Sequence, residues 1–438
     1  MKIFQFLPLC LLLFACGTEP SDATTAPVGE PETPVRTDYT NFSFDQAIKL
    51  PDGFGAAVVA DGIGKRARHL AIRDNGDLYI QMNRATENGN TIVALRDTDG
   101  DGKADQREEF NDQTGTGMRI HDGHLYCSSD VAVYRYPLTD ALLPDPAGRT
   151  LIAGGFIEQQ EHASKNFTFD NAGNLYVNVG APSNACMIEH RTAGSAGMDP
   201  CPQLDRQAGI WKFSATQAAQ TQERDGQRYA TGIRNALALD WNEATNSLFA
   251  LQHGRDQLHS FWEGMYTTEE NAKSPAEEFL SISEGDDFGW PYCYFDTQLD
   301  QKTLAPEYGG DKQQAGRCAG KSQPILTFPA HMAPNDLMFY TGDQFPERYR
   351  NGAFIAFHGS WNRAPEPQKG YFVVFVPMKD GQPSGDWEIF ADQFAGSGTI
   401  ASPGDAQHRP MGLAQGPDGS LYVTDSVEGK VWRIVYGV

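Results

Sequence analysis

Five short polar segments hold the side chains in this sequence that could take part in chemistry. In chain order they contain His162, the pair Arg234-Asn235, the turn His253-Gly254-Arg255, Arg363 and Arg409. Arginine forms charge-assisted hydrogen bonds to anions, and histidine exchanges a proton near neutral pH. Gathered at one place, these residues would suit an anionic, planar ligand. Taken singly, each Arg would be a surface ion-pair partner and each His a structural hydrogen-bonding residue.

An acidic segment, 97–108, has the spacing of a calcium-binding loop. Its carboxylates fall at positions one, three, five, nine and twelve, with Gly at six and a main-chain ligand at seven. The ligands expected from this spacing are Asp97, Asp99, Asp101, Lys103, Asp105 and Glu108. Because the flanking residues are strand-like, we expect a structural Ca²⁺ site on a β-hairpin. The alternative is a solvated acidic hairpin tip.

A polar turn followed by a short apolar strand recurs six times along the chain. In the clearest copy, 161–180, Phe167 and Phe169 alternate before a turn at 170–174 and a second strand at 175–179. Such alternation around an Asn/Asp/Gly turn is typical of a β-hairpin. The second strands of the six copies contain Leu78, Leu125, Leu175, Leu248, Phe354 and Leu421. Repeated units of short strands indicate propeller blades, so the sequence predicts an all-β, six-bladed β-propeller.

Propellers bind ligands over a central channel, on the loops that join one blade to the next. The five polar segments each precede or follow a predicted blade strand at an equivalent place. This repeated placement favours a shared ligand site over scattered surface residues.

Several longer motifs occur in a fixed order through the chain. They are LPDGF (50–54), RDTDGDGKAD (96–105), GIRNALAL (232–239), HGRDQL (253–258), DFGWPYCYFD (287–296), FYTGDQFPERYRNGAF (339–354), HGSWNR (358–363) and RPMGLAQGPDGSLYVTD (409–425). With the His162 segment, this set resembles the soluble, PQQ-dependent glucose/sorbosone dehydrogenase family, especially its sorbosone- and pyranose-dehydrogenase-like branch. The resemblance covers the chain from Leu50 to Val435.

The resemblance implies roles for individual residues. His162 would be the catalytic base, and Arg234 and Asn235 would hold the quinone cofactor. Gly254 and Arg255 would bind an active-site Ca²⁺ through their main-chain carbonyls, although the glucose enzymes have Pro at the latter position. The remaining cofactor contacts that it implies are Arg363, Arg409 and Thr424.

Such an enzyme would oxidise a sugar, a sugar aldehyde or a polyol with PQQ and Ca²⁺ as cofactors. His162, with a pKa near 6.5, would take the hydroxyl proton while hydride passes to the quinone. Electrons would leave to an external acceptor, because no Cys-x-x-Cys-His haem motif occurs. Two alternatives remain: a non-catalytic sugar-binding propeller, and a calcium-dependent lactonase, for which acidic rather than cationic channel segments would be expected.

The N-terminal sequence indicates export from the cytoplasm. Residues 1–15 read as a signal peptide that ends in Leu-Phe-Ala before Cys16, which resembles a bacterial lipobox. We therefore expect a lipid anchor at Cys16, a tether over 16–44, a propeller domain over 45–438 and a location in the bacterial cell envelope, facing the periplasm or the exterior. The alternative is an ordinary signal peptide with an incidental Cys.

A formal net charge of −22 argues against nucleic acid as a partner.

The cysteines suit an oxidising compartment. Cys186 and Cys201 flank one polar excursion, and Cys293 and Cys318 bracket another loop, so each pair could close a short loop. Cys127 lies in a predicted strand and is expected to be a buried free thiol.

Overall fold

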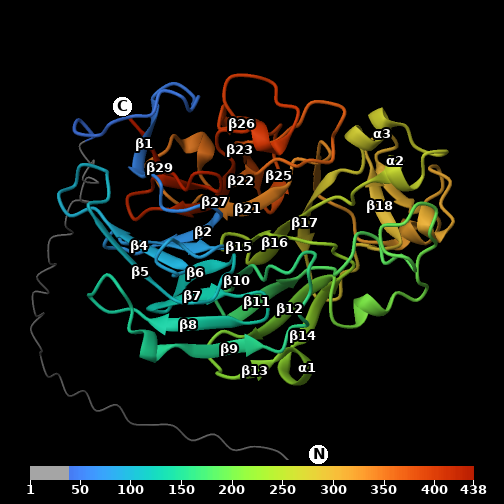
Figure 1. Ribbon diagram of the computed structural model, residues 1–438, viewed down its shortest axis with the longest axis horizontal. Helices are drawn as coiled ribbons and strands as arrows, with labels where there is room; N and C mark the ends of the chain where they lie inside the picture. The colour runs from blue at the N-terminus through green and yellow to red at the C-terminus, as the bar shows by residue number, and fades with distance from the viewer. Residues whose placement is uncertain (1–38) are drawn as a thin grey trace, which may run out of the picture. The chain divides into compact units, whose positions relative to one another are not determined.

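The computed structural model describes residues 39–438 and confirms the all-β propeller, with six main sheets following one another along the chain (Figure 1). The predicted signal peptide, Cys16 and most of the predicted tether lie outside the described residues. The fold begins before residue 45, because Phe42 is buried and Phe44 forms a bridge with Ala57. Within 39–438, no helix has the length and hydrophobicity needed to cross a bilayer.

Each blade is an antiparallel sheet, and the first strand of each blade contacts the first strands of its neighbours around the channel. From the channel outward, the first blade contains β2 (Ala67–Ile72), β3 (Leu78–Met82), β4 (Ile92–Arg96) and β5 (Gln106–Phe110), and the second contains β6 (Met118–His121), β7 (His124–Ser128), β8 (Val133–Pro137), β9 (Thr150–Gly154) and an added parallel strand, β13 (Gln220–Thr221). The third blade contains β10 (Phe167–Phe169), β11 (Asn174–Val179), β12 (Gly209–Ser214) and β14 (Gln227–Thr231), and the fourth contains β15 (Ala238–Asn242), β16 (Ser247–Gln252), β17 (Glu277–Ile282) and β20 (Leu326–Phe328). The fifth blade contains β21 (Pro334–Phe339), β22 (Ala353–Phe357), β23 (Phe372–Val376) and β26 (Glu388–Ala391), and the last contains β27 (Pro410–Gln415), β28 (Leu421–Asp425), β29 (Val431–Tyr436) and β1 (Phe54–Ala60).

Strands from both ends of the folded part close the ring. β1 pairs with β29 as the outer strand of the last blade, with Phe54 opposite Tyr436, and Figure 1 shows blue β1 beside red β29. The Phe54 ring also contacts Phe345 and Phe390, with centroids 4.9 and 5.1 Å apart. Aromatic packing and main-chain hydrogen bonds therefore hold β1 against the rest of the last blade.

The polar turn that recurs six times in the sequence joins the first and second strands of a blade. In the third blade, Asp170 Oδ1 accepts hydrogen bonds from the main-chain N of Ala172 (2.9 Å) and Asn174 (2.8 Å), and Gly173 has a φ of 80°. The six apolar residues predicted on second strands are all buried there: Leu78, Leu125, Leu175, Leu248, Phe354 and Leu421.

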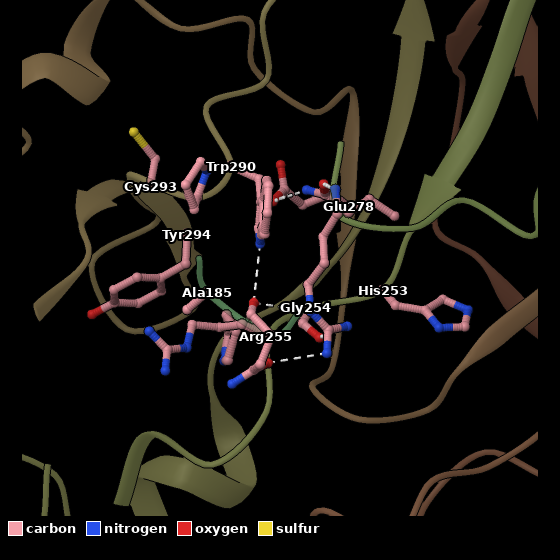
Figure 2. Close-up of a pocket in the computed structure, with 13 residues that line it drawn as sticks. Ala185, His253, Gly254, Arg255, Glu278, Trp290, Cys293 and Tyr294 are labelled. Atoms are coloured by element: carbon pink, nitrogen blue, oxygen red, sulfur yellow. Dashed lines mark hydrogen bonds between the residues drawn. The ribbon is translucent and has the colours of Figure 1, made fainter. Parts of the chain in front are cut away.

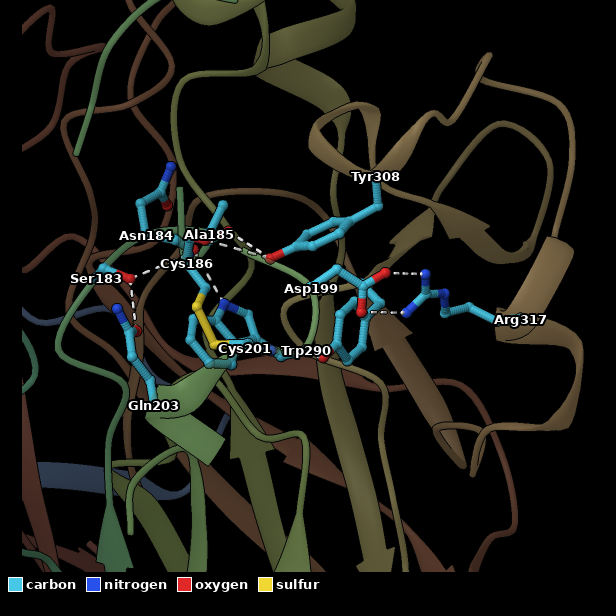
Figure 3. The surroundings of a disulfide bond; sticks show 11 residues. Ser183, Asn184, Ala185, Cys186, Asp199, Cys201, Gln203, Trp290, Tyr308 and Arg317 are labelled. Carbon is cyan, nitrogen blue, oxygen red and sulfur yellow. Dashed lines mark hydrogen bonds and ion pairs between the residues drawn. A yellow bond between two sulfur atoms is a disulfide. The ribbon is translucent and has the colours of Figure 1, made fainter. Parts of the chain in front are cut away.

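Insertions between strands form a side lobe next to the blades (Figure 1). The short elements of the insertions are α2 (Leu258–Phe261), α3 (Thr268–Lys273), β18 (Cys293–Asp296) and β19 (Gln301–Leu304), and elsewhere α1 (Gln222–Asp225), β24 (Met378–Lys379) and β25 (Gln382–Pro383). Both suggested cysteine pairings are confirmed, as disulfides Cys186–Cys201 and Cys293–Cys318. Figure 3 shows the first beside Trp290, and Cys127 is a buried free thiol as predicted.

Candidate active site

Most of the residues predicted for the cofactor site lie at one end of the central channel, here called the mouth. His162 precedes β10, the pair Arg234-Asn235 precedes β15, and Arg409 directly precedes β27. Second strands run antiparallel to first strands, so the residues that follow β16, at 253–256, reach the same end.

The imidazole of His162 is held in one tautomer. Its Nδ1 lies 2.7 Å from the main-chain O of Ala181, and because a carbonyl only accepts, Nδ1 carries the proton and Nε2 is left as an acceptor. His162 has a φ of 50°, a conformation that costs energy for a residue with a side chain. A Cβ at Gly180 would lie 2.6 Å from His162 Cβ and 2.9 Å from Asn235 Oδ1. Glycine at 180 therefore allows His162 and Asn235 to approach each other.

The charge state of His162 is set by burial and by Arg234. Together they lower the pKa of His162 to about 3, and the Ala181 carbonyl, Asp256 and Glu161 only partly oppose this. The ring is neutral at neutral pH, as a base must be, but the expected pKa near 6.5 is wrong for the protein without a ligand. An anion bound in the mouth would favour the imidazolium and raise this pKa.

The guanidinium of Arg234 is buried and held by oxygen atoms. Its Nη2 donates to Asp256 Oδ2 (2.8 Å) and Asn184 Oδ1 (3.0 Å), and its Nη1 donates to Gly254 O (3.1 Å). The neighbouring Asn235 is buried as well. Asp256 belongs to the motif at 253–258 but was given no role from the sequence, although its place directly after the predicted metal-binding turn could have indicated one.

The turn predicted to bind the active-site Ca²⁺ presents oxygen donors. Gly254 O and Asp256 Oδ2 both face Arg234, and Gly254 N donates to Glu277 Oε2 at 2.9 Å. Burial raises the pKa of Glu277 to about 7. Carbonyl and carboxylate oxygens are the ligands that Ca²⁺ prefers, and a carbonyl has a second lone pair. The oxygens of Gly254 and Asp256 are of the kind that fits Ca²⁺, and a bound ion would share them with the Arg234 guanidinium.

The side chain of Arg255 lies in a small pocket beneath the turn, lined also by Trp290 and Tyr294 (Figure 2). Its Nη1 donates to Glu307 Oε2 at 2.5 Å, whereas its Nε and Nη2 are buried and have no hydrogen-bond partner in the part of the chain that the structure describes. The pocket has a volume of about 10 Å³, enough for about one water molecule. The Arg255 side chain thus binds Glu307 in the side lobe, and only the main chain of Arg255 is available as a metal ligand at the turn.

One buried cation, Lys165, and two half-buried ones, Arg68 and Arg409, give the mouth a positive charge. Arg409 donates from Nε to His358 O at 3.0 Å. Burial, and then nearby cations that include Arg409, lower the pKa of Arg68 to about 10, and burial lowers the pKa of Lys165 to about 8. Asp130 partly offsets both charges. In the described part of the chain, none of these three cations has a carboxylate within 4.0 Å.

This arrangement fits a ligand with several carboxylates, as PQQ has. Among residues 39–438, Arg68 Nε is a buried donor with no hydrogen-bond partner, and a buried charge needs a counter-charge. Arg68 and Lys165 were not predicted as site residues. Lys165 could have been found, because it lies in the same polar segment as His162.

Two predicted contacts differ from the others. The Thr424 hydroxyl uses its only proton within the fold, since it donates to Arg68 O (2.7 Å) and accepts from Gly412 N (2.9 Å), which joins the last blade to the first. Arg363 donates from Nε to Pro367 O at 2.8 Å and lines a separate cavity.

The acidic loop lies on the β4–β5 hairpin, as predicted, away from the mouth. Carboxylate oxygens of Asp97, Asp99 and Asp105 gather within 4.8 Å of one another. Asp97 also accepts hydrogen bonds from the main-chain N of Gly100 (2.8 Å) and Gly102 (2.9 Å). The predicted ligands outside this cluster are Asp101, Lys103 and Glu108.

Comparison with known sequences gives one family and several distant relatives. A family model described as TrAA12-like matches residues 48–436. A pyrroloquinoline quinone-dependent pyranose dehydrogenase of Coprinopsis cinerea is 24% identical over 426 residues, covering 88% of this chain and 54% of that protein. An uncharacterized protein of Borreliella burgdorferi is 27% identical over 209 residues, 47% of this chain and 48% of its own length. The chain therefore spans about half the length of the curated relatives it matches.

Solved structures share the fold. The calcium structure of a Trichoderma reesei enzyme of carbohydrate-active family AA12 aligns with a TM-score of 0.71 at 18% identity, covering 91% of this chain and 99% of that one. The holo form of the PQQ domain of pyranose dehydrogenase from Coprinopsis cinerea gives 0.69 at 19% identity, covering 90% and 97%. Because the family model spans nearly all of the described propeller, this protein belongs to the TrAA12-like family.

Proposed function

We propose that this protein is a PQQ- and Ca²⁺-dependent dehydrogenase that oxidises a sugar, a sugar aldehyde or a polyol and passes the electrons to an external acceptor. The observation that carries the proposal is His162, a neutral histidine with an available Nε2, at the same end of the channel as Arg68, Lys165 and Arg409, which have no carboxylate within 4.0 Å among the described residues. Membership of the TrAA12-like family and the name of the Coprinopsis cinerea relative support it.

The cations of the mouth would hold the cofactor. Arg68, Lys165 and Arg409 would meet the carboxylates of PQQ through charge-assisted hydrogen bonds, with Arg234 and Asn235 beside them. When bound, PQQ would accept hydride from the carbinol carbon, and Ca²⁺ would polarise the reactive quinone carbonyl.

Within the protein, His162 would act as the general base. Its Nε2 would accept the hydroxyl proton of the substrate, because the bond from Nδ1 to Ala181 O keeps Nε2 free and fixes the ring. Glu161 and Asp256 favour the protonated ring and would stabilise the imidazolium. The carboxylates of the cofactor would raise the pKa from about 3 toward the working range of a base.

The active-site Ca²⁺ would be held by the main-chain carbonyls of Gly254 and Arg255, with the Asp256 carboxylate nearby. Because Arg234 donates to Gly254 O and Asp256 Oδ2, its position would be coupled to metal binding. A second, structural Ca²⁺ is proposed for the 97–108 loop, supported by the gathered oxygens of Asp97, Asp99 and Asp105.

A lipid anchor at Cys16 is proposed from the lipobox-like sequence, and with it a location in the cell envelope. Cys16→Ser should move the protein from the membrane fraction to the soluble fraction. A wild-type protein that is already soluble and carries no lipid by mass spectrometry would remove this proposal.

The proposed activity is tested by titrating the purified protein with PQQ at fixed Ca²⁺ and following dye-linked oxidation of aldoses, sorbosone and polyols. We expect saturable activation that requires both PQQ and Ca²⁺. A protein that binds sugars but no PQQ would be a binding propeller instead. Hydrolysis of lactones without PQQ would favour the lactonase.

A further inference from the structure

Arg363 is buried, with 6% of its surface exposed, yet it has no carboxylate partner within 4.0 Å among the described residues. Its Nε donates to Pro367 O (2.8 Å), and its Nη1 donates to Ala272 O and to Ala330 O (3.3 Å). These carbonyls fix the guanidinium but do not neutralise it. Buried arginines are normally paired with an anion, so this unpaired charge requires an explanation.

The guanidinium lines a cavity of about 320 Å³ that also contains two lysines. Lys273 is the last residue of α3, and Lys369 lies with Arg363 in the loop between β22 and β23. The other wall includes Thr327 and Phe328 of β20, the outer strand of the neighbouring blade. None of the described residues that line this cavity carries a carboxylate.

The three cations repel one another. Burial, and then Arg363 and Lys273, lower the pKa of Lys369, and burial lowers the pKa of Arg363. The nearest acids are at the rim: Glu269 pairs with Lys273 at 2.5 Å, and the exposed Glu366 acts on Arg363. In a chain whose formal net charge is −22, three cations around one cavity are a local exception.

This cavity is separate from the mouth. The residues that line it, among them Thr327, Phe328 and Lys369, include none of the residues described above at the mouth. An anion bound beside Arg363 would therefore leave the proposed cofactor site open.

We infer that the cavity around Arg363, Lys273 and Lys369 binds a phosphate group, either as inorganic phosphate or as a phosphate monoester. A phosphate dianion matches the charges of Arg363 and Lys369, which have no carboxylate within 4.0 Å among the described residues, with Lys273 beside them. Arg363 Nη2 has no hydrogen-bond partner in the described chain and can donate to the phosphate. The Thr327 hydroxyl lines the same cavity and can donate as well. The volume exceeds that of a monatomic anion such as chloride and leaves room for a small ester group.

The test uses the full chain loaded with PQQ and Ca²⁺, without free excess Ca²⁺, and inorganic phosphate as the probe in ³¹P NMR titrations. Lys369→Gln should weaken phosphate binding about tenfold, as expected for the loss of one charge-assisted hydrogen bond. Lys379→Gln, which removes the same charge from an exposed lysine on β24, should leave it unchanged. Arg363→Gln should weaken it further, with folding checked by circular dichroism.

Arg409→Gln separates this cavity from the mouth. Phosphate binding that survives Arg409→Gln and falls in Lys369→Gln supports the inference. The inference is overturned if wild type shows no saturable binding, if Lys369→Gln and Lys379→Gln bind equally, or if Arg409→Gln alone abolishes binding. Glycerol 3-phosphate is titrated in the same way. If it binds more tightly than inorganic phosphate, the ligand is a phosphate monoester, and if it binds more weakly, the ligand is inorganic phosphate. Either order supports the site. If the protein takes up no PQQ, the same titration on the unloaded chain tests this cavity independently of the proposed dehydrogenase.

Discussion

His162 and Arg234 are joined through one residue, Ala181. The Ala181 carbonyl accepts from His162 Nδ1 at 2.7 Å, and the Ala181 N–H donates to Arg234 O at 2.7 Å. Ala181 follows β11, so the second strand of the third blade positions both the proposed base and the start of the next blade. The base and the Arg234-Asn235 pair therefore form one structural unit.

Replacing His162 by Ala should lower turnover about 10²–10⁴-fold, the usual contribution of a general base. PQQ affinity should change little, because the buried cations rather than His162 would hold the carboxylates. Dye-linked turnover and PQQ titration measure the two quantities. His124→Ala, at the start of β7, is the matched control and should behave as wild type. Full turnover in His162→Ala would show that another group is the base.

The low pKa of His162 has a consequence for stability. Its pKa is about 3 in the folded protein and about 6.5 in an unfolded chain, so below pH 6.5 the unfolded state binds the extra proton. His162 therefore destabilises the fold progressively as the pH falls from about 6.5 toward 3. Glu277 and Asp240, whose pKa values are raised to about 7 and about 6, act in the opposite sense.

A comparison with His162→Gln isolates this effect from the carboxylates. Between pH 7.5 and pH 4.5, the free energy of unfolding measured with urea should fall more in wild type than in His162→Gln. Bound PQQ should reduce the difference by raising the pKa of His162. Equal losses in the two proteins would mean that His162 does not carry a depressed pKa.

Glu161 and Arg191 form a two-point ion pair next to the proposed base. Arg191 Nε donates to Glu161 Oε1 at 2.7 Å and Nη2 donates to Oε2 at 3.1 Å, which joins the His162 segment to the disulfide-closed loop. Arg191→Gln should lower turnover about tenfold by loosening the position of His162, without weakening PQQ binding. It should also raise the pKa of His162 seen in the pH–rate profile, because Glu161 loses its partner cation.

The exposed pair Arg317–Asp199 offers the control for this variant, since it is a similar two-point ion pair in the same lobe (Figure 3). Arg317→Gln should change neither turnover nor the pH profile. An Arg191→Gln enzyme with wild-type turnover and an unshifted profile would reduce the Glu161–Arg191 pair to a surface contact.

The acidic loop should bind one Ca²⁺ independently of the cofactor. Asp97→Asn combined with Asp105→Asn should lower the calcium stoichiometry by one and lower the melting temperature, while PQQ affinity is kept. Asp140→Asn, outside the loop, is the control. Unchanged stoichiometry would return the loop to a solvated hairpin tip.

The propeller was predictable because its signals are local. Leu175 and its counterparts follow turns such as 170–174 in every blade, and each disulfide closes a loop that its own cysteines bracket. The residues of the mouth were only partly predictable, because burial in the folded protein decides which cations lack a counter-charge and could bind an anionic ligand. Arg68 gives no local signal, because its surroundings come from distant parts of the sequence, such as Met411, 343 residues away. Arg363 follows His358 closely in sequence, yet its guanidinium turns to the carbonyl of Ala272, 91 residues away.

The central claim is tested most directly by the absorption spectrum of protein reconstituted with PQQ and Ca²⁺, recorded without an electron acceptor before and after sugars are added. We predict that PQQ stays with the protein through gel filtration and that at least one aldose, sorbosone or polyol converts its spectrum to the reduced form. Failure to retain PQQ in the presence of Ca²⁺, or retained PQQ that stays oxidised with every compound, would contradict the proposed dehydrogenase.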